Sequence, residues 1–192
     1  MSFDHFRFTL RATLFEWLGQ SERALAAWES CARLRPENTI PVRSIAWIHA
    51  QKHRWEAAAE WFERAVALEP GHADSWFNLG YAREKLGQTE AALKAFGRCA
   101  ELNPKHDRAW YGTGMILAHK GEHGRAVEFF ERAAELQPFN GAAWHALGMA
   151  YHHTHQPDAV KRVIEHCLHH DGPAAKRLIH DAQRSDLTHL LE

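Results

Sequence analysis

The sequence repeats itself with a period of 34 residues, and this period limits the folds that the chain can adopt. Successive blocks begin at His5, Thr39, Ala73, Asp107 and Gly141. A unit of this length cannot bury its apolar residues alone, so neighbouring units must stack on one another. The period therefore predicts an array of five units, over residues 5–38, 39–72, 73–106, 107–140 and 141–172.

Within each block, equivalent places hold similar residues, and their pattern predicts two helices joined by a turn. Large residues at the fourth place accompany small residues at the eighth, namely Phe8, Val42, Trp76, Trp110 and Trp144 with Ala12, Ala46, Gly80, Gly114 and Gly148. The twentieth place is small and the twenty-fourth large, as in the pairs Ala92 and Phe96 or Ala126 and Phe130. Small and large residues can interlock where two helices approach closely.

Turn residues recur at fixed places as well. The thirty-second place holds Pro36, Pro70, Pro104 and Pro138, which end one helix and turn the chain toward the next. The turn inside the block carries Gly19, Gly87 and Gly121, with His53 and His155 in the other two blocks. Each block is therefore predicted to be a helical hairpin.

These residues resemble the tetratricopeptide repeat, whose pattern is Trp, Leu-Gly, Tyr, then Ala, Phe, Ala and Pro over 34 residues. The third block matches it at Trp76, Leu79, Gly80, Ala92, Phe96 and Pro104, and departs from it at Arg83 and Cys99. The resemblance covers residues 5–172 and implies an all-α fold, a right-handed solenoid of five helix-turn-helix tetratricopeptide repeats.

The segment after the last block is predicted to close the array. Gly172-Pro173 is a helix-opening signal, and residues 173–192 place Leu178, Ile179, Ala182, Leu187 and Leu190 for burial. We expect a C-terminal capping helix over this range.

The three cysteines all fall at the twenty-seventh place, in the first, third and fifth blocks, as Cys31, Cys99 and Cys167. Packed helices lie roughly 8 to 10 Å apart, so cysteines two repeats apart exceed the roughly 7 Å limit for a disulfide. We expect them to be reduced, buried and inert.

Composition excludes several functions. Lys plus Arg is 23 and Asp plus Glu is 24, which gives no field that would recruit nucleic acid or an anionic membrane, and an RNA-reading helical repeat is disfavoured. We find no export signal and no stretch apolar enough to span a bilayer, so the expected location is cytoplasmic. Without a phosphate-binding glycine loop, nucleophile elbow or His-Glu-x-x-His motif, the chain is not expected to be an enzyme or to need a cofactor.

Histidine is over-represented, with 16 copies, many of them in the fifth block. His166 and His170 are one helical turn apart, and His145 lies two turns from His152, so a metal-responsive regulatory domain is one alternative. No Cys or carboxylate spacing completes a tetrahedral set, so the preferred interpretation is solvated polar positions and no metal site.

The resemblance implies that the first helices of the repeats line a concave groove. The predicted peptide-binding residues there are Arg43, Trp47, Phe77, Asn78, Tyr81, Arg108 and Tyr111. Aromatic anchors with scattered charge suit an extended or helical peptide with an acidic group, although the rings can instead pack between repeats. Some members of this family clamp the carboxylates of chaperone tails. Arg43, Asn78 and Arg108 match that clamp in type, but Trp47 and Gly112 do not, so it is incomplete.

The expected function is a protein-interaction adaptor or scaffold that binds another protein or a peptide in this groove. The main alternative is a self-assembling module that stacks end to end through its terminal repeats. Phe3, Phe6 and Phe8 place apolar residues beside the first repeat for such a contact, and the partner is then another copy of the chain.

Overall fold

The computed structural model describes residues 3–191, with the side chain of Phe3 outside the described part, and every regular element in that range is helical. The chain divides between Leu102 and Asn103 into two compact units. The first unit contains α1 (Phe3–Trp17), α2 (Ser21–Leu34), α3 (Thr39–Gln51), α4 (Trp55–Leu68), α5 (Ala73–Lys85) and α6 (Thr89–Leu102). The second contains α7 (Asp107–His119), α8 (His123–Leu136), α9 (Gly141–His153), α10 (Pro157–His170), α11 (Gly172–Asp181) and the 3₁₀ helix η1 (Ser185–Leu191). The predicted all-α fold of paired helices is confirmed.

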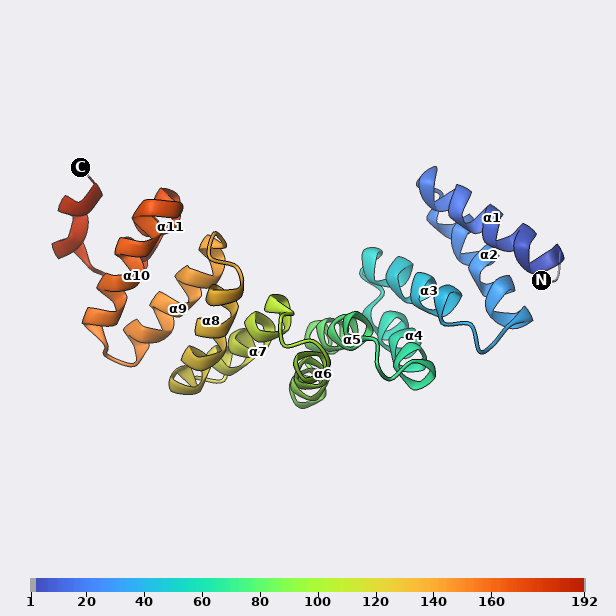
Figure 1. The fold of residues 1–192 in the computed structure, drawn as a ribbon, viewed down its shortest axis with the longest axis horizontal. Coiled ribbons are helices and arrows are strands. Elements are labelled where there is room, and N and C mark those ends of the chain that lie inside the picture. Colours follow the sequence, from blue (N-terminus) through green and yellow to red (C-terminus); the bar gives the residue numbers. More distant parts are fainter. Residues whose placement is uncertain (1–2, 192) are drawn as a thin grey trace. The chain divides into compact units, whose positions relative to one another are not determined.

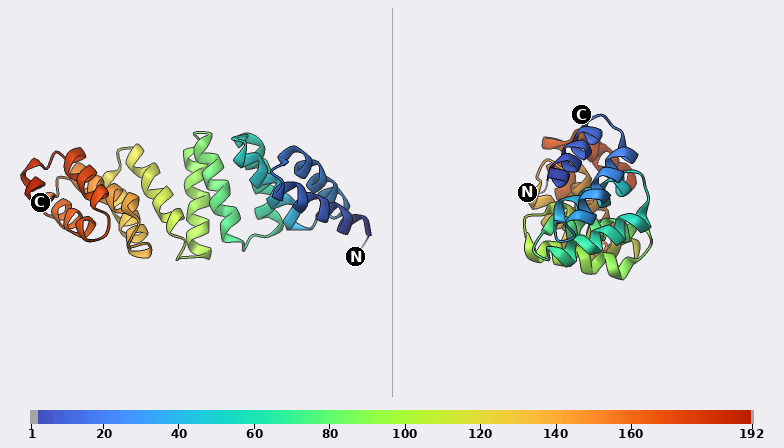
Figure 2. Two further views of the ribbon diagram at one scale, coloured as in Figure 1. Left: turned by 90° about the horizontal axis from the view of Figure 1, so that it is seen from above. Right: turned by 90° about the vertical axis from the view of Figure 1, so that its right-hand side faces the viewer.

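Within each unit, consecutive helices pack side by side, as Figures 1 and 2 show. In the first unit, α1 pairs with α2, α3 with α4 and α5 with α6, and α2 and α4 also pack on the helix that follows each. In the second unit, α7 pairs with α8 and α9 with α10, while α8 packs on α9. Each helix therefore meets mainly its neighbours in sequence, as expected of stacked hairpins.

Four helices begin where the sequence places the start of a block, at Thr39, Ala73, Asp107 and Gly141. A side-chain cap explains three of these starts, two of them through asparagine and the start at Ala73 through His72. The Asn38 side chain accepts a hydrogen bond from the backbone N–H of Ile40, and Asn140 accepts from Ala142 and Ala143. Each asparagine satisfies a donor that the first turn of a helix leaves without an intrahelical partner.

The turns inside the blocks use left-handed backbone. Gly19, Gly87 and Gly121 have φ of 69°, 70° and 78°, and His53 and His155 reach 55° and 57°. Glycine adopts this conformation without steric cost, whereas a histidine there is strained. The predicted equivalence of the two histidines to the glycines is confirmed.

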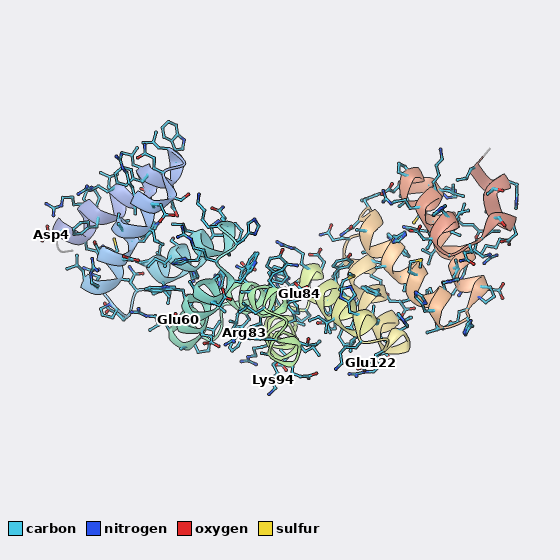
Figure 3. All side chains as sticks on the ribbon, turned by 180° about the vertical axis from the view of Figure 1, so that it is seen from behind. Asp4, Glu60, Arg83, Glu84, Lys94 and Glu122 are labelled. Carbon is cyan, nitrogen blue, oxygen red and sulfur yellow. The ribbon has the colours of Figure 1, made fainter. Side chains whose placement is uncertain are left out.

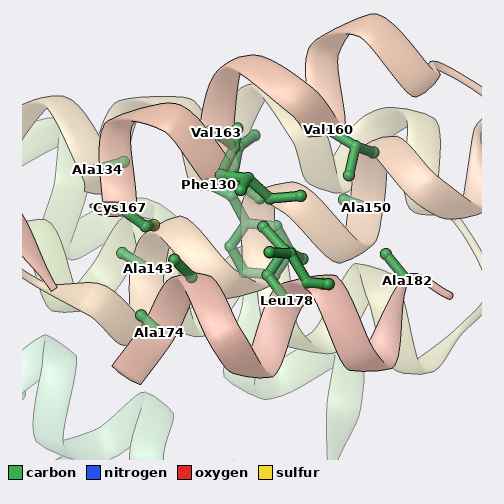
Figure 4. Packing of buried hydrophobic residues seen from close by; sticks show 14 of the residues in the cluster. Phe130, Ala134, Ala143, Ala150, Val160, Val163, Cys167, Ala174, Leu178 and Ala182 are labelled. Atoms are coloured by element: carbon green, nitrogen blue, oxygen red, sulfur yellow. The ribbon is translucent and has the colours of Figure 1, made fainter. Parts of the chain in front are cut away.

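Small and large residues interlock between the two helices of a hairpin. A Cβ added to Gly80 would lie 2.6 Å from the Phe96 ring, and one added to Gly114 would lie 2.7 Å from Phe130. Gly148 instead meets Leu178 of α11, at 2.4 Å. Phe130 and Leu178 are both buried in the core of the second unit, shown in Figure 4.

A hydrogen bond that the sequence pattern did not predict ties three of the four inter-block turns to the helix that follows each of them. The indole Nε1 of Trp76 donates to the Pro70 carbonyl at 2.8 Å, Trp110 to Pro104 at 3.1 Å, and Trp144 to Pro138 at 2.9 Å. The fourth-place tryptophan therefore fixes the turn that the thirty-second-place proline begins.

The C-terminal cap differs from its prediction. Instead of one helix over residues 173–192, α11 ends at Asp181, Gln183 takes φ of 54°, and η1 follows. The left-handed backbone at Gln183 reverses the direction of the chain. Leu187 therefore packs in the same buried core as Leu178 and Ile179. A single helix would carry Leu187 away from that core.

All three cysteines are free and buried. Burial is the main cause that raises the pKa of Cys99 and of Cys167 to about 11. A thiol with so high a pKa is hardly ionised near neutral pH, and the thiolate is the reactive form. The predicted burial of the cysteines is confirmed.

Charged side chains line the outside of the helices, as the labelled Glu60 and Lys94 illustrate in Figure 3. Ion pairs between exposed groups, such as Arg98 with Glu101, contribute little stability. Among the described helices, none is long and apolar enough to cross a membrane.

Candidate functional site: two pockets on the first helices of the repeats

The first unit holds a pocket of about 540 Å³, which we name the Arg43 pocket. Three predicted site residues line it: Arg43 and Trp47 from α3 and Asn78 from α5. The complete lining is Glu16, Gly19, Ser21, Arg43, Ser44, Trp47, Ile48, Gln51, Phe62, His72, Ser75 and Asn78. The Arg43 pocket therefore combines hydrogen-bonding groups with a large aromatic side chain.

Arg43 is already paired. Its Nη1 donates to Glu69 Oε2 at 2.5 Å, and the arginine side chain is 28% exposed. Glu69 is the C-cap residue of α4, so the pair joins two neighbouring helices. A guanidinium has five N–H donors, and this bond uses one nitrogen, so a second acceptor can still reach the group. An acidic ligand at Arg43 must share the cation with Glu69 or displace it.

Trp47 is 50% exposed and is the largest apolar side chain open to the pocket. Also in the lining, His72 Nδ1 accepts from the backbone N–H of Ser75, and the Ser75 hydroxyl lies 3.0 Å from the same nitrogen. The bond from the Ser75 N–H is a helix cap at the start of α5, because His72 accepts a donor that the first turn leaves without an intrahelical partner.

Phe77 and Tyr81 lie beside one another on α5. Phe77 is 6% exposed and packs on Phe96 with ring centroids 5.6 Å apart. Tyr81 stacks on Phe77 at 6.5 Å, meets Trp55 edge-on at 5.7 Å and carries Lys85 over its ring at 4.9 Å. Buried Phe77 therefore packs beneath Tyr81, and of these two rings only that of Tyr81 is exposed to a partner.

The other two predicted residues belong to the second unit. Arg108 is exposed near the start of α7. Tyr111 is half-buried, its ring lies 5.8 Å from Phe130, and burial raises its pKa. That Arg43 and Arg108 contribute to one groove stays a prediction.

Tyr111 lines a second pocket, of about 420 Å³, which we name the Met115 pocket. Its lining residues come from α7, α8, α9 and α11: Tyr111, Met115, Ala118, His119, His123, Phe130, Ala142, His145, Ala146, Met149, Ala150, His153 and Arg177. Methionine, alanine and tyrosine form its apolar part, and four imidazoles and a guanidinium supply the polar groups.

The histidines of this pocket are arranged by ring and ion-pair contacts. His123 and His153 stack with centroids 4.2 Å apart and planes 20° apart. Burial, and then the positive charge of His153, lower the pKa of His123. His145 Nε2 lies 2.9 Å from Asp181 Oδ2. Hydrogen bonds from His180 and then His145 lower the pKa of Asp181.

The two histidines considered as a metal pair, the alternative to solvated positions, contact an aromatic ring and a backbone carbonyl. The His166 ring lies 3.8 Å from Trp144 and 4.7 Å from His170, and its Nε2 is 3.3 Å from the Pro138 carbonyl. His166 thus covers the tryptophan of its own repeat. Among residues 3–191, no three His, Cys, Asp or Glu side chains gather in a way that could hold a metal ion.

Sequence reasoning missed three contributors to the pockets. Glu69 pairs with Arg43 from the end of the preceding helix, and His123 reaches the Met115 pocket from a second helix, α8. Arg177 comes from the capping segment, outside the repeat pattern. A repeat pattern describes equivalent places, so it carries no signal for side chains that enter from helix ends or from the cap.

Apolar side chains also gather on the surface of α1. Phe6, Leu10 and Leu14, spaced by four, are about half exposed, and Trp17 is 82% exposed. The other face of α1 packs on α2 through residues such as Phe8, Ala12 and Phe15. In the described parts of α11 and η1, no large apolar side chain is exposed to this degree.

Comparison with known proteins agrees with this architecture. The sequence matches tetratricopeptide-repeat families over residues 9–73, 43–98 and 77–141, and again over 129–161. These segments cover more than half of the chain. The chain belongs to the tetratricopeptide-repeat family.

Among curated proteins, the chain is similar to the general transcriptional corepressor trfA of Dictyostelium discoideum. The two are 32% identical over 66 residues, which is 34% of this chain and 5% of the corepressor. The chain thus spans only a small part of that relative's length.

Solved structures show the same fold over most of the chain. The MamA protein superposes with a TM-score of 0.83 at 22% identity, covering 92% of this chain and 96% of MamA. MamA 41-end from Desulfovibrio magneticus RS-1 gives 0.77 at 19% identity, covering 94% of this chain and 98% of that one. YrrB, described as a TPR protein with an unusual peptide-binding site, gives 0.73 at 24% identity, covering 86% of this chain and 87% of YrrB.

Proposed function

We propose that this chain is a protein-interaction adaptor that holds a peptide or a partner helix against the first helices of its repeats. The observation that carries the proposal is the Arg43 pocket, where half-exposed Trp47 lies among hydrogen-bonding side chains and a cation. Membership of the tetratricopeptide-repeat family supports this role, as does the fold shared with YrrB, a protein with a peptide-binding site.

The Arg43 pocket suits a segment with an apolar side chain next to an acidic group. Trp47 offers a broad apolar surface with few rotatable bonds, and such aromatic anchors carry much of the energy of an interface. Asn78 and Gln51 can bind the peptide backbone of the partner through their side-chain amides. Arg43 takes the acidic group, because guanidinium and carboxylate pair well.

Selection of peptides from a random display library against the folded protein tests the proposal. Selected peptides are then titrated against the wild type and against a Trp47→Ala, Arg43→Gln double variant. We expect affinity to fall by tenfold or more, since hot-spot residues contribute about 2 kcal/mol or more each. Gln is chosen because Glu at position 43 would repel Glu69.

Arg98→Gln is the matched control, because this exposed arginine of α6 has its own ion pair outside the pocket. Circular dichroism must show equal helix content for all variants. Peptides that bind the double variant as tightly as the wild type would rule out the Arg43 pocket as the binding surface.

The Arg43–Glu69 pair leads to a further prediction, that Glu69 weakens the binding of acidic ligands. Glu69→Gln removes the competing carboxylate, so selected peptides with Asp or Glu should bind more tightly to this variant, by roughly threefold to tenfold. Their Asn or Gln counterparts should gain nothing. An equal gain for both peptide classes would show that Arg43 does not select charge.

Self-association is a second candidate function. It is favoured by the exposed apolar side chains Phe6, Leu10, Leu14 and Trp17, which we call the apolar stripe on α1. Because the described C-terminal elements expose no equivalent stripe, the observation supports contact between two α1 helices over end-to-end stacking, and such a closed contact gives a dimer. Sedimentation across a dilution series should reveal a dimer that Leu10→Glu abolishes and Phe139→Glu retains. A wild-type monomer at high concentration would eliminate this candidate.

A further inference from the structure

The Met115 pocket is lined partly by apolar and partly by basic side chains, and this combination indicates the chemistry of its ligand. Met115 and Met149 lie on facing first helices, α7 and α9, and Tyr111 is held against Phe130. Methionine side chains are flexible and polarisable, so they adapt to apolar groups of varied shape. This part of the pocket fits one apolar side chain.

The polar groups of the pocket are cationic or able to become so. His119, His123, His145 and His153 line it with Arg177, and no carboxylate is among the lining residues. Arg177 is exposed on α11 and makes no ion pair within residues 3–191. In a chain whose charges nearly balance, this is a local concentration of basic groups. An anionic group beside the apolar one is therefore the complementary ligand.

We propose that the Met115 pocket is a second binding site, for an apolar side chain next to a carboxylate, and that its affinity rises as the pH falls toward 6. The proposal rests on the proposed function, because it assigns this ligand to a partner polypeptide. It adds a site in the second unit and makes binding there depend on protons.

The proton dependence follows from the groups that face the pocket. Histidines ordinarily titrate near pH ~6.5, so acidification adds positive charge while Arg177 stays charged throughout. Two acids lie next to pocket histidines: Asp181 contacts His145, and Glu122, which precedes His123 in the chain, pairs with Lys120 and Arg125. Glu122 is neutralised by its two cations, whereas Asp181 offsets the charge that a proton on His145 would add. The net gain of positive charge is therefore expected from the pocket histidines other than His145. Burial, and then the charge of the stacked His153, lower the pKa of His123, which favours the neutral form of this imidazole.

Methionine labelling provides a direct probe. The chain has three methionines, and two of them, Met115 and Met149, line this pocket. With carbon-13 in the methionine methyl groups, N-acetyl-leucine is titrated into the intact protein at pH 7.5 and at pH 6.0. N-acetyl-leucinamide, which has the same side chain and no carboxylate, is the matched neutral probe.

We expect saturable shifts of the Met115 and Met149 signals with the carboxylate probe, and an apparent Kd at pH 6.0 lower by roughly threefold or more. Arg177→Gln should weaken binding at both pH values, whereas Lys176→Gln, its exposed neighbour on α11, should not. Equal binding of the amide, or no saturable shift at either pH, would overturn the proposal. Because the peptide test uses Trp47 and Arg43 of the first unit, its outcome separates failure of the adaptor role from failure of this site.

Discussion

At the scale of single residues, some glycines occupy places where a side chain would not fit. Gly80 in α5 leaves no room for a methyl group, because the Phe96 ring would lie 2.6 Å from its Cβ. Gly97 in α6 has open space at the same position. The two glycines lie in one unit and in neighbouring helices, so they form a matched pair.

Gly80→Ala should destabilise the first unit by about 1 to 3 kcal/mol, because the ring must move from its rotamer. Gly97→Ala should stabilise it by about 0.5 to 1 kcal/mol, because alanine has the higher helix propensity. Urea unfolding followed by circular dichroism measures both. If the two variants shift the midpoint in the same direction, close packing at Gly80 is not what selects glycine there.

His123 makes stability depend on pH. Its pKa in the folded chain is lowered from 6.5, first by burial and then by His153. Between the folded value and 6.5 the unfolded chain binds more protons, so stability that is complete above pH 6.5 declines as the pH falls through this window.

The urea midpoint should therefore be lower at pH 5.5 than at pH 7.5, and His123→Gln should reduce this difference. His49 also has a lowered pKa, mainly through burial, so part of the dependence should persist. His170→Gln, an exposed control, should leave the difference unchanged. An unaltered pH dependence in His123→Gln would exclude the stacked pair as its source.

At the scale of elements, α11 substitutes for the helix that a sixth repeat would supply. Gly148 of α9 receives Leu178 of α11, whereas the equivalent glycines Gly80 and Gly114 receive a phenylalanine from their own hairpin. Leu178 is fully buried, and the same helix carries Arg177 into the Met115 pocket. The cap thus serves both the core and the second pocket.

Leu178→Ala should lower the stability of the second unit by about 2 to 5 kcal/mol, the range for a large buried side chain that leaves a cavity. Lys176→Ala, at an exposed place on the same helix, should stay within about 0.5 kcal/mol. Thermal unfolding is the measurement. Near-equal melting temperatures for the two variants would show that α11 is not part of the cooperative core.

The sequence predicts the elements better than it predicts the site. The 34-residue period is visible because every hairpin meets the same neighbours, so the same places need the same residue sizes. Helix starts at Thr39 and Gly141 and the turns at His53 and His155 follow from it. The pairing of Arg43 with Glu69 cannot be predicted from the period. Long charged side chains can pair with any opposite charge within their reach, and the period does not specify which one. The end of α11 at Asp181 was also missed, since the cap lies outside the period.

At the scale of the whole molecule, the chain is two units, and the predicted groove residues are divided between them. Arg43, Trp47, Phe77, Asn78 and Tyr81 lie in the first unit, and Arg108 and Tyr111 in the second. Each unit has its own pocket on its first helices. Sequence periodicity treats all five blocks as equivalent and so gives no sign of this division.

The second unit should fold alone. Its core joins residues of α7 through η1, among them Leu117, Phe130, Leu147 and Leu187, without a residue from the first unit. A fragment of residues 103–192 should therefore be helical and melt cooperatively. Its circular dichroism on heating tests this expectation, and a helical spectrum without a melting transition would contradict it.

The bond from tryptophan to the proline carbonyl has a consequence for how such a gene can change. Donor and acceptor are always six residues apart, as in Trp76 with Pro70 and Trp110 with Pro104. If recombination removed the segment 73–106, Trp110 would follow Pro70 at the same spacing, and the new junction would inherit the old bond. Loss or duplication of a period whose fourth place holds tryptophan would thus leave these junctions chemically intact, and arrays of different length become accessible in single genetic steps.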